Sequence, residues 1–321
     1  MSVLPFLYRK RRASEAAVPT GIASASPDCR LDLGRWGWWG RRDQRTRQVR
    51  LVLPGSLAIL GLICAFAPPR GKAVGSEQEK GLRPEEIAER ALNSYGGRSA
   101  LYTIQRNGIY RALLKLHTPT GIQEGKTVTK FIRKPKLVED LVTLELELPD
   151  LTYTLTFDGK AVWSTQNGTS RTPTDQEIRA FRGAHQHHFE ALLRYKESDA
   201  KLDLIGSNKI GTLDLDLIQM TFPDGVTTVY EISRRSGRIL YLNYEETPAG
   251  AATPTKYRLY FKDFRVIQNT LIPYETQVFQ DGKLIEERKI VEAVFNVQLE
   301  EKAFQSEQAK AAATAGAPKT E

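Results

Sequence analysis

The sequence predicts an α+β fold that is mainly antiparallel β: a curled, unclosed β-barrel of about ten strands, with a covering N-terminal helix and an inserted lid helix. Three observations support this prediction. Apolar and polar residues alternate in several runs after residue 140, which is the period of half-buried strands. Asp-Gly and Asn-Gly pairs, which favour tight hairpin turns, separate many of these runs. One segment with helical periodicity precedes the strand pattern, and another interrupts it.

The first 75 residues differ in charge from the rest of the chain. They contain 13 Lys and Arg residues against four Asp and Glu, whereas the remainder has a net charge of −1. Residues 1–50 form a basic N-terminal extension, which we expect to be disordered because it lacks helical or strand periodicity. The excess positive charge lies in the first 75 residues. The chain therefore shows no evident basic surface that would bind phosphates, and we expect no nucleic acid partner.

An apolar run at residues 51–67 directly follows the arginine-rich end of this extension. A positive flank before a short apolar core is typical of a secretion signal, so residues 51–75 are predicted to be a signal peptide or an N-terminal membrane anchor. The body is therefore expected to be exported to the periplasm or cell envelope. If the run is not cleaved, residues 51–67 anchor the body in the inner membrane.

Residues 82–305 are predicted to form one domain, which is long enough to bury a sizeable core. Cys29 and Cys64 both precede this body, so it has neither a disulfide framework nor a thiolate metal site. Residues 306–321 are rich in Ala and Lys and have no regular period, and we expect them to form a disordered tail.

The body is predicted to open with a helix. Pro84 suits the first helical turn, and the two glutamates that follow it favour the positive end of the helix dipole. Gly96 and Gly97 end the helix. Its apolar stripe at 3.6-residue spacing consists of Ile87, Ala88, Ala91, Leu92 and Tyr95. We expect this stripe to pack on the sheet.

Strands are predicted to dominate the rest of the body. Alternation is clearest at residues 142–148, 153–157, 213–217 and 257–261. After Leu217 the alternation of apolar and polar residues shifts by one position, so that the next apolar series begins at Ile218. This shift predicts a bulge or a change of face. Turn pairs follow or separate these runs at Asp158-Gly159, Asn167-Gly168, Asp224-Gly225 and Asp281-Gly282. Hairpins at this density predict an antiparallel sheet rather than a βαβ architecture.

Residues 176–195 are predicted to form a single helix inserted between strands, with Thr174 or Asp175 as its N-cap. Its apolar face includes Ile178, Phe181, Phe189, Leu192 and Leu193. A sheet of about ten strands is near the size at which it has to curl. A helix laid over the concave face of such a sheet would enclose an apolar cavity.

The sequence offers no set of residues that indicates catalysis. His185, His187 and His188 are close together, but no third ligand has the spacing of a metal site, and we expect them to pack on the surface or beneath the lid. The body contains no cysteine and no Gly-x-Ser-x-Gly nucleophile turn. We therefore predict that the protein is not an enzyme and has no metal and no cofactor.

Several short segments, in a fixed order over residues 85–304, are similar to the lipoprotein-localisation carrier superfamily. The chain resembles the LolA/LolB-like carriers and, in particular, the outer-membrane lipoprotein-sorting proteins. The segments are Leu92-Asn93-Ser94-Tyr95-Gly96-Gly97, Phe131-Ile132-Arg133-Lys134-Pro135-Lys136, Phe157-Asp158-Gly159-Lys160-Ala161-Val162-Trp163, Tyr230-Glu231-Ile232, Ser236-Gly237-Arg238-Ile239, Phe261-Lys262-Asp263-Phe264-Arg265, Leu271-Ile272-Pro273 and the closing residues 296–304. Arg133 and Pro135 lie in a strand-edge segment comparable to that of the family.

The resemblance implies an unclosed barrel with helices over its mouth and a cavity that holds acyl chains of lipids or lipoproteins. Envelope proteins of the inner or outer membrane are the other expected partners. The alternative is a membrane-anchored sensor or protein-interaction module of the same fold. Candidate cavity residues are the five lid residues Ile178, Phe181, Phe189, Leu192 and Leu193 and, from the sheet, Leu144, Leu146, Tyr153, Leu155, Phe157, Leu215 and Leu217.

Overall fold

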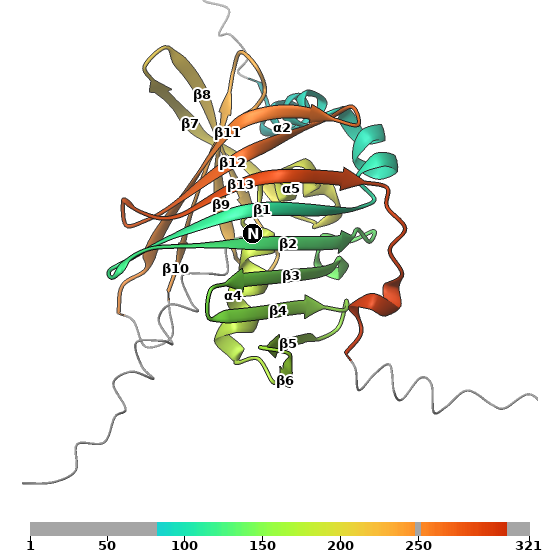
Figure 1. The fold of residues 1–321 in the computed structure, drawn as a ribbon. Helices are drawn as coiled ribbons and strands as arrows, with labels where there is room; N and C mark the ends of the chain where they lie inside the picture. Colours follow the sequence, from blue (N-terminus) through green and yellow to red (C-terminus); the bar gives the residue numbers. More distant parts are fainter. Residues whose placement is uncertain (1–81, 248–251, 307–321) are drawn as a thin grey trace, which may run out of the picture. The chain divides into compact units, whose positions relative to one another are not determined.

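The computed structural model describes residues 82–247 and 252–306, all of which belong to one compact unit. Within them, thirteen strands form one antiparallel sheet (Figure 1). They are β1 (Asn107–Thr118), β2 (Gly121–Ile132), β3 (Leu141–Leu148), β4 (Leu151–Phe157), β5 (Val162–Gln166), β6 (Thr169–Arg171), β7 (Lys201–Ile210), β8 (Leu213–Thr221), β9 (Thr227–Ser233), β10 (Ile239–Glu246), β11 (Thr255–Ile267), β12 (Thr270–Gln280) and β13 (Lys283–Phe295). The predicted fold class, a curled and unclosed antiparallel sheet with a few helices, is confirmed.

Short helices precede, interrupt and follow the sheet. They are α2 (Pro84–Ser94), α3 (Gly97–Ser99), a π-helical turn (Ala100–Ile104), a 3₁₀ turn (Leu137–Glu139), α4 (Asp175–Gln186), α5 (Phe189–Leu193) and two further 3₁₀ turns (Tyr195–Glu197 and Glu301–Phe304). None of the helices in the described ranges is long and apolar enough to cross a membrane. The predicted anchor, the N-terminal extension and nearly all of the predicted tail lie outside the described residues.

The strand order explains where the lid comes from. Consecutive strands pair with each other except β6 and β7, and β1 also pairs with β13, so the order runs from β6 through β1 and β13 to β7. The outermost strands, β6 and β7, are thus at opposite edges, although they are consecutive in the chain. The segment that joins them has to cross the whole sheet, and it carries α4 and α5 over one face (Figure 1).

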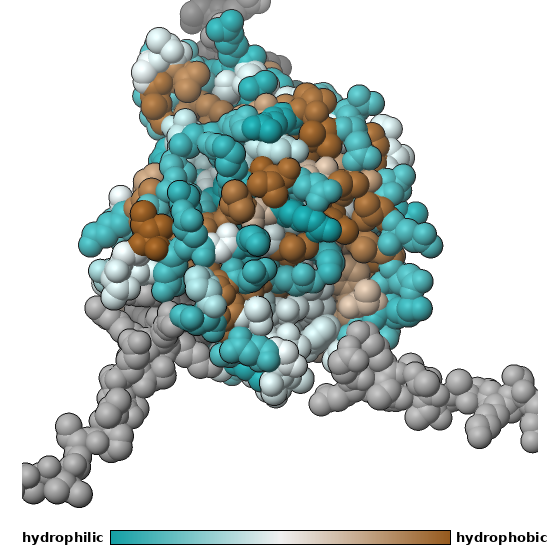
Figure 2. All heavy atoms as spheres, viewed as in Figure 1, coloured by the Kyte–Doolittle hydropathy of each residue, from teal (hydrophilic) through white to brown (hydrophobic). Residues whose placement is uncertain are grey.

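The core has two main clusters on the helix-covered side. In one, α2 and α5 pack against β8–β12, with Leu92, Leu192 and Phe261 among its buried residues. In the other, Phe181 of α4 packs against residues of β1–β5, β12 and β13, such as Leu155 and Phe295. Hydrophilic side chains predominate on the face viewed in Figure 2, which β1, β2 and β13 cross in Figure 1. One face of the sheet thus holds the core, as the alternating pattern predicts.

Both predicted helix starts are confirmed. Pro84 begins α2, and the predicted apolar stripe is buried. Thr174 caps α4, because its hydroxyl accepts a hydrogen bond from the Glu177 backbone while the Glu177 carboxylate accepts one from the Thr174 backbone. This reciprocal capping box satisfies two otherwise unpaired donors.

The predicted irregularity near Leu217 is also present. Ile205 of β7 is an extra residue in the ladder, because Leu204 pairs with Ile218 and Gly206 pairs with Leu217. In β8 the burial shifts at the same place, so that Leu215 and Ile218, three residues apart, are both fully buried. The phase slip in the sequence therefore marks a β-bulge in the partner strand.

Replacing Gly282 by Val should destabilise the body by about 1 kcal/mol or more. Asp281 and Gly282 both have positive φ, 47° and 78°, as a two-residue hairpin turn requires. A β-branched residue resists this conformation. A Cβ at Gly282 would contact nothing, so the cost is conformational. Urea unfolding measures the effect, and Gly282→Asn, which tolerates positive φ, is the matched control. Equal stability of the Val variant and the wild type would contradict the turn assignment.

Candidate functional site

The lid segment is broken into two helices, which corrects the prediction of one helix over residues 176–195. α4 ends at Gln186 and α5 begins at Phe189, so His187 and His188 form the break. The His187 ring stacks on Tyr244 at 3.8 Å between ring centroids, and its Nδ1 lies 2.7 Å from the Thr228 hydroxyl. The Tyr230 hydroxyl donates a hydrogen bond to the His188 carbonyl. Residues of β9 and β10 thus hold the break against the sheet.

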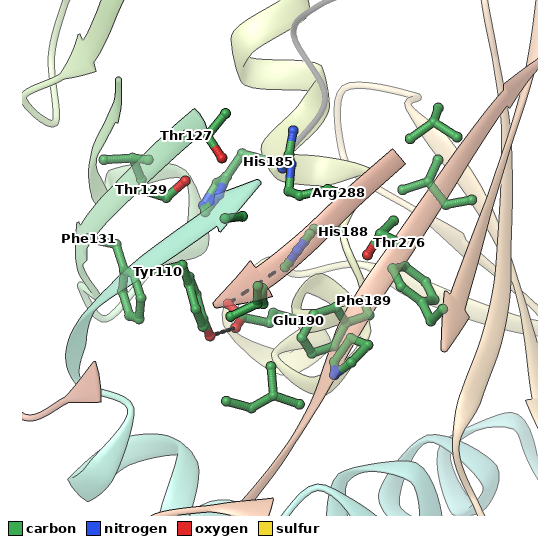
Figure 3. Close-up of a pocket in the computed structure, with 18 of the residues that line it drawn as sticks. Tyr110, Thr127, Thr129, Phe131, His185, His188, Phe189, Glu190, Thr276 and Arg288 are labelled. Atoms are coloured by element: carbon green, nitrogen blue, oxygen red, sulfur yellow. Dashed lines mark hydrogen bonds and ion pairs between the residues drawn. The ribbon is translucent and has the colours of Figure 1, made fainter. Parts of the chain in front are cut away.

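A cavity of about 80 Å³ lies between this break and the inner face of the sheet (Figure 3). Strands β1–β3 and β11–β13 line it from the sheet side, and the segment around the break lines it from the lid side. It therefore lies where the two halves of the sheet meet, next to both core clusters. Its apolar wall includes Ala112, Phe131, Phe189, Phe261, Val278 and Ile290.

The rest of the cavity wall is polar. Hydroxyl groups of Thr127, Thr129 and Thr276 line it, together with several charged side chains and two histidines. The charged groups and histidines are Arg133, Asp140, His185, His188, Glu190, Glu286 and Arg288. Charged groups in a buried site need partners, because desolvation disfavours an isolated charge. Each of the two arginines has a glutamate partner.

Arg133 of the strand-edge segment pairs with Glu190 of α5. Arg133 Nη2 lies 2.7 Å from Glu190 Oε2, and the two side chains are only 6% and 14% exposed. The Tyr110 hydroxyl also donates to Glu190, at 3.1 Å (Figure 3). Burial, the largest single effect, would raise the pKa of Glu190, but the surrounding positive charges, that of Arg133 first among them, together outweigh burial and the pKa falls to about 2. Glu190 is therefore ionised, and the pair ties the lid to the sheet.

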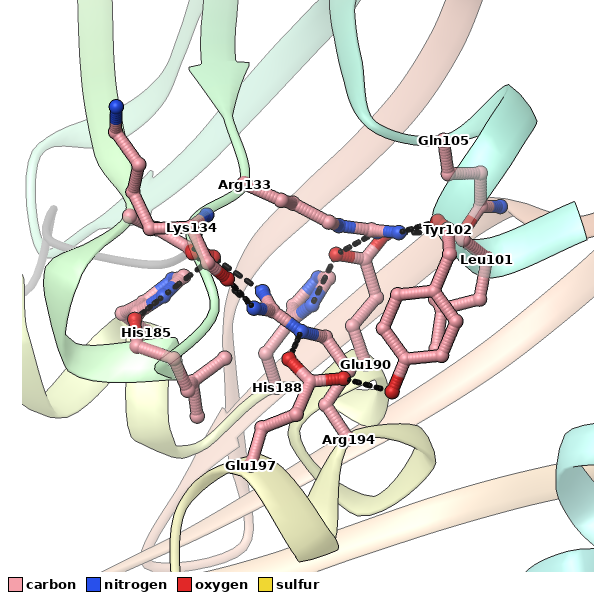
Figure 4. A network of polar contacts seen from close by, with 12 residues as sticks. Leu101, Tyr102, Gln105, Arg133, Lys134, His185, His188, Glu190, Arg194 and Glu197 are labelled. Carbon is pink, nitrogen blue, oxygen red and sulfur yellow. Dashed lines mark hydrogen bonds and ion pairs between the residues drawn. The ribbon is translucent and has the colours of Figure 1, made fainter. Parts of the chain in front are cut away.

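A second network ties the end of the lid to the loop after β2 (Figure 4). Arg194 pairs with Asp140 through two nitrogens and donates a third hydrogen bond to the Lys134 carbonyl at 2.8 Å. Its Nε donates to Glu197. His185 Nε2 lies 3.4 Å from Asp140 and 3.0 Å from the Leu137 carbonyl. The histidines thus contribute to closing the lid, as the packing hypothesis expects.

The stability of the body should fall as the pH drops below about 6.5. Burial lowers the pKa of His187 to about 4 and that of His188 to about 3. Between these values and the unfolded value near 6.5, the unfolded chain binds more protons than the folded one, so acid favours unfolding. We expect the free energy of unfolding to be lower by roughly 2–4 kcal/mol at pH 5 than at pH 7. Urea titrations at the two pH values measure this difference.

A variant with both His187 and His188 replaced by Gln is the control for this prediction. It removes the two groups whose protonation differs between the folded and unfolded states, so its stability should change much less over the same interval. An equally steep decline in this variant would show that other groups cause the pH dependence.

The structure brings few of the sequence-predicted candidates to the cavity itself. Phe189 and Arg133 line it. Pro135 is exposed in the loop after β2. Ile178, Phe181, Leu144, Leu146, Tyr153, Leu155 and Phe157 belong to the cluster beneath α4. Leu192 and Leu193 belong to the cluster beneath α2 and α5. Leu215 is buried in β8, and neighbouring Leu217 is half-buried. These candidates from the two clusters therefore pack as core instead of lining the cavity.

Most of the cavity wall was not among the predicted residues. Tyr110 and Ala112 of β1, Phe261 of β11 and the β13 pair Glu286 and Arg288 line it. One pattern in the sequence could have indicated part of this wall. Glu286, Arg288 and Ile290 are two residues apart in a strand and share a face, so two charges on a face that also carries apolar residues indicate a buried polar site. Among the described residues, no group of three metal-ligating side chains could hold an ion.

No family model matches the sequence, and no curated protein matches it. Solved structures are similar in fold. An outer membrane lipoprotein-sorting protein domain from Vibrio parahaemolyticus is 13% identical, with a TM-score of 0.48, over 68% of this chain and 95% of that one. A DUF1329 family protein from Desulfovibrio piger is 11% identical, with a TM-score of 0.47, over 71% and 99%.

A LolA superfamily protein from Nitrosomonas europaea is 9% identical, with a TM-score of 0.49, over 71% of this chain and 99% of that one. The similar structures therefore include the family that the sequence resembles. At these identities and TM-scores no functional residue is carried over to this chain, so its function is argued from its own cavity.

Proposed function

We propose that the body is a non-catalytic carrier or binding protein of the cell envelope that holds acyl chains of lipids or lipoproteins between its lid and its sheet. The observation that carries this proposal is the cavity beneath the broken lid, with Phe189, Phe261 and Val278 in its wall. Aromatic and aliphatic walls with a few polar groups are typical of small-molecule sites. Each methylene buried there contributes about 0.8 kcal/mol.

The lid has to move for an acyl chain to enter. The cavity of about 80 Å³ holds only several water-sized molecules. Ligand sites generally measure about 300–1,000 Å³. The lid is held by polar contacts of Glu190 and Arg194 and by apolar side chains of α4 and α5 that are buried in the two core clusters, so opening has to separate this packing as well. In this proposal, the arrangement with the small cavity corresponds to the closed state of the carrier.

Filling the cavity should prevent binding. Ala112 lines the cavity from β1, whereas Ala293 of β13 is buried in the adjoining cluster without lining it. Both face the same side of the sheet, so replacing either by Met adds the same atoms to a packed interior. We expect Ala112→Met to weaken binding of a fluorescent fatty-acid probe at least about tenfold and Ala293→Met to change it little.

Fluorescence titration of the probe measures both variants, and circular dichroism confirms that they are folded. Equal binding by the wild type and Ala112→Met would show that the acyl chain does not occupy this cavity. No binding by any of the proteins would favour the alternative, a protein-interaction module of the same fold.

A further inference from the structure

Arg288 is a buried arginine with unused hydrogen-bonding capacity in the cavity wall. Its side chain is 13% exposed, and its Nη2 donates to Glu286 Oε1 at 2.6 Å. Its Nε is buried and has no hydrogen-bond partner among residues 82–247 and 252–306. A buried donor without an acceptor costs free energy, so a native structure that retains one calls for an explanation.

Arg133 lies in the same wall, but it already has a partner, because Glu190 Oε2 lies 2.7 Å from Arg133 Nη2 as an ion pair. Figure 3 shows Arg288 near the lid segment that carries His188 and Glu190. The hydroxyls of Thr127, Thr129 and Thr276 add further donors to this wall.

Two of the acidic groups around the cavity already have more than one partner. Glu190 takes one from Tyr110 and pairs with Arg133. Asp140 takes hydrogen bonds from Arg194 and from the backbone of Lys134. The hydrogen-bonding group of the wall that has no partner among the described residues, Arg288 Nε, is a donor. A ligand that brings hydrogen-bond acceptors suits this donor better than a cation does.

The polar and apolar parts of the wall are adjacent in the ladder. On β12, Thr276 lies directly opposite Arg288, and Val278 lies directly opposite Glu286. On β11, Leu259 lies directly opposite Val278. All five residues line the cavity. A molecule with its head at Arg288 can thus lay a chain along Val278 and Leu259.

On the basis of the proposed function, we propose that the ligand is an amphiphile with an anionic head, a carboxylate or a phosphate, and that Arg288 binds this head inside the cavity. The planar guanidinium matches either group, and charge-assisted hydrogen bonds of this kind are among the strong ones. Thr276 supplies a neighbouring hydroxyl. The acyl chain then contacts the apolar wall, and the lid closes over the head.

The test is competition with three ligands that have the same chain and different heads. Palmityl alcohol, palmitic acid and hexadecyl phosphate compete with a fluorescent fatty-alcohol probe for the full-length protein. We expect at least one of the anions to bind roughly tenfold more tightly than the alcohol, or more, because a hydrogen bond to a charged group has this effect. The anion that is preferred identifies the head, and preference for both indicates recognition of negative charge alone.

Variants connect this preference to Arg288. Arg288→Gln should bring the ratio of anion to alcohol affinity close to one. Because this change leaves Glu286 buried without its arginine, Glu286→Gln combined with Arg288→Gln provides a neutral pair that avoids an isolated charge. Arg111→Gln, which removes the same charge from a half-exposed residue paired with Glu292, is the control and should keep the preference of the wild type.

Two results would overturn the inference and leave the proposed function standing. One is a wild-type protein that binds the alcohol as tightly as both anions. The other is a double variant that keeps the preference for the anion. If the wild type binds none of the three ligands and no probe, the proposed function fails as well.

Discussion

Replacing Arg194 by Met should destabilise the body by about 3–5 kcal/mol, because it leaves a buried carboxylate without its partner. The Arg194 and Asp140 side chains are 2% and 3% exposed. Burial alone would raise the pKa of Asp140, but hydrogen bonds from His185 and Arg194 and their charges outweigh burial and lower it. Removing Arg194 takes away its charge and its two hydrogen bonds to Asp140 and leaves only His185 and the Lys134 backbone N–H to compensate for burial. It also removes the hydrogen bond to the Lys134 carbonyl.

Urea unfolding measures this loss, and a half-exposed ion pair provides the matched control. Arg98 pairs with Glu89 near α2, and its side chain is 37% exposed. Arg98→Met removes the same charge with the same substitution, and we expect it to cost less than about 1 kcal/mol. Similar losses in the two variants would contradict the view that the Arg194 network is a buried anchor of the lid.

Replacing Phe189 by Asp should reduce binding of a fatty-acid probe roughly hundredfold or more, because it places a charge on the apolar wall, where desolvation is costly. Phe189 is buried, lines the cavity and packs on Tyr95 and Phe261, with ring centroids 5.5 and 5.6 Å away. The new carboxylate would also lie on the same short helix as Glu190.

Phe189→Leu is the control for this substitution. It retains an apolar side chain in the wall, so binding should fall much less than in Phe189→Asp. Probe titration is compared with the circular dichroism of each variant, so that loss of the fold is distinguished from loss of the site. Undiminished binding by a folded Phe189→Asp variant would place the ligand elsewhere on the protein.

The sequence predicted the fold class because its signals are local. Alternation, Asp-Gly turns and the N-cap candidates Thr174 and Asp175 each depend on residues a few positions apart. The helix break at His187 was missed for the opposite reason. The apolar stripe continues through it, and what stabilises the break is stacking on Tyr244 and the contact with Thr228, which are distant in sequence.

The cavity could be predicted only in part for the same reason. Phe189 was found because it lies on the apolar face of the lid segment, and Arg133 because the resemblance placed it at a strand edge. The remaining wall depends on the pairing of β1 with β13, the first and last strands. That pairing brings Ala112 opposite Ile290, and no local pattern in the sequence specifies it.

The most direct test of the account is mass spectrometry of small molecules that co-purify with the protein. The account predicts that a lipid or another acylated amphiphile accompanies the wild type and that Ala112→Met, which fills the cavity, retains much less of it than Ala293→Met. A wild-type protein that carries no acyl chain, or an Ala112→Met variant that carries as much as Ala293→Met, would contradict the claim that acyl chains bind beneath the lid.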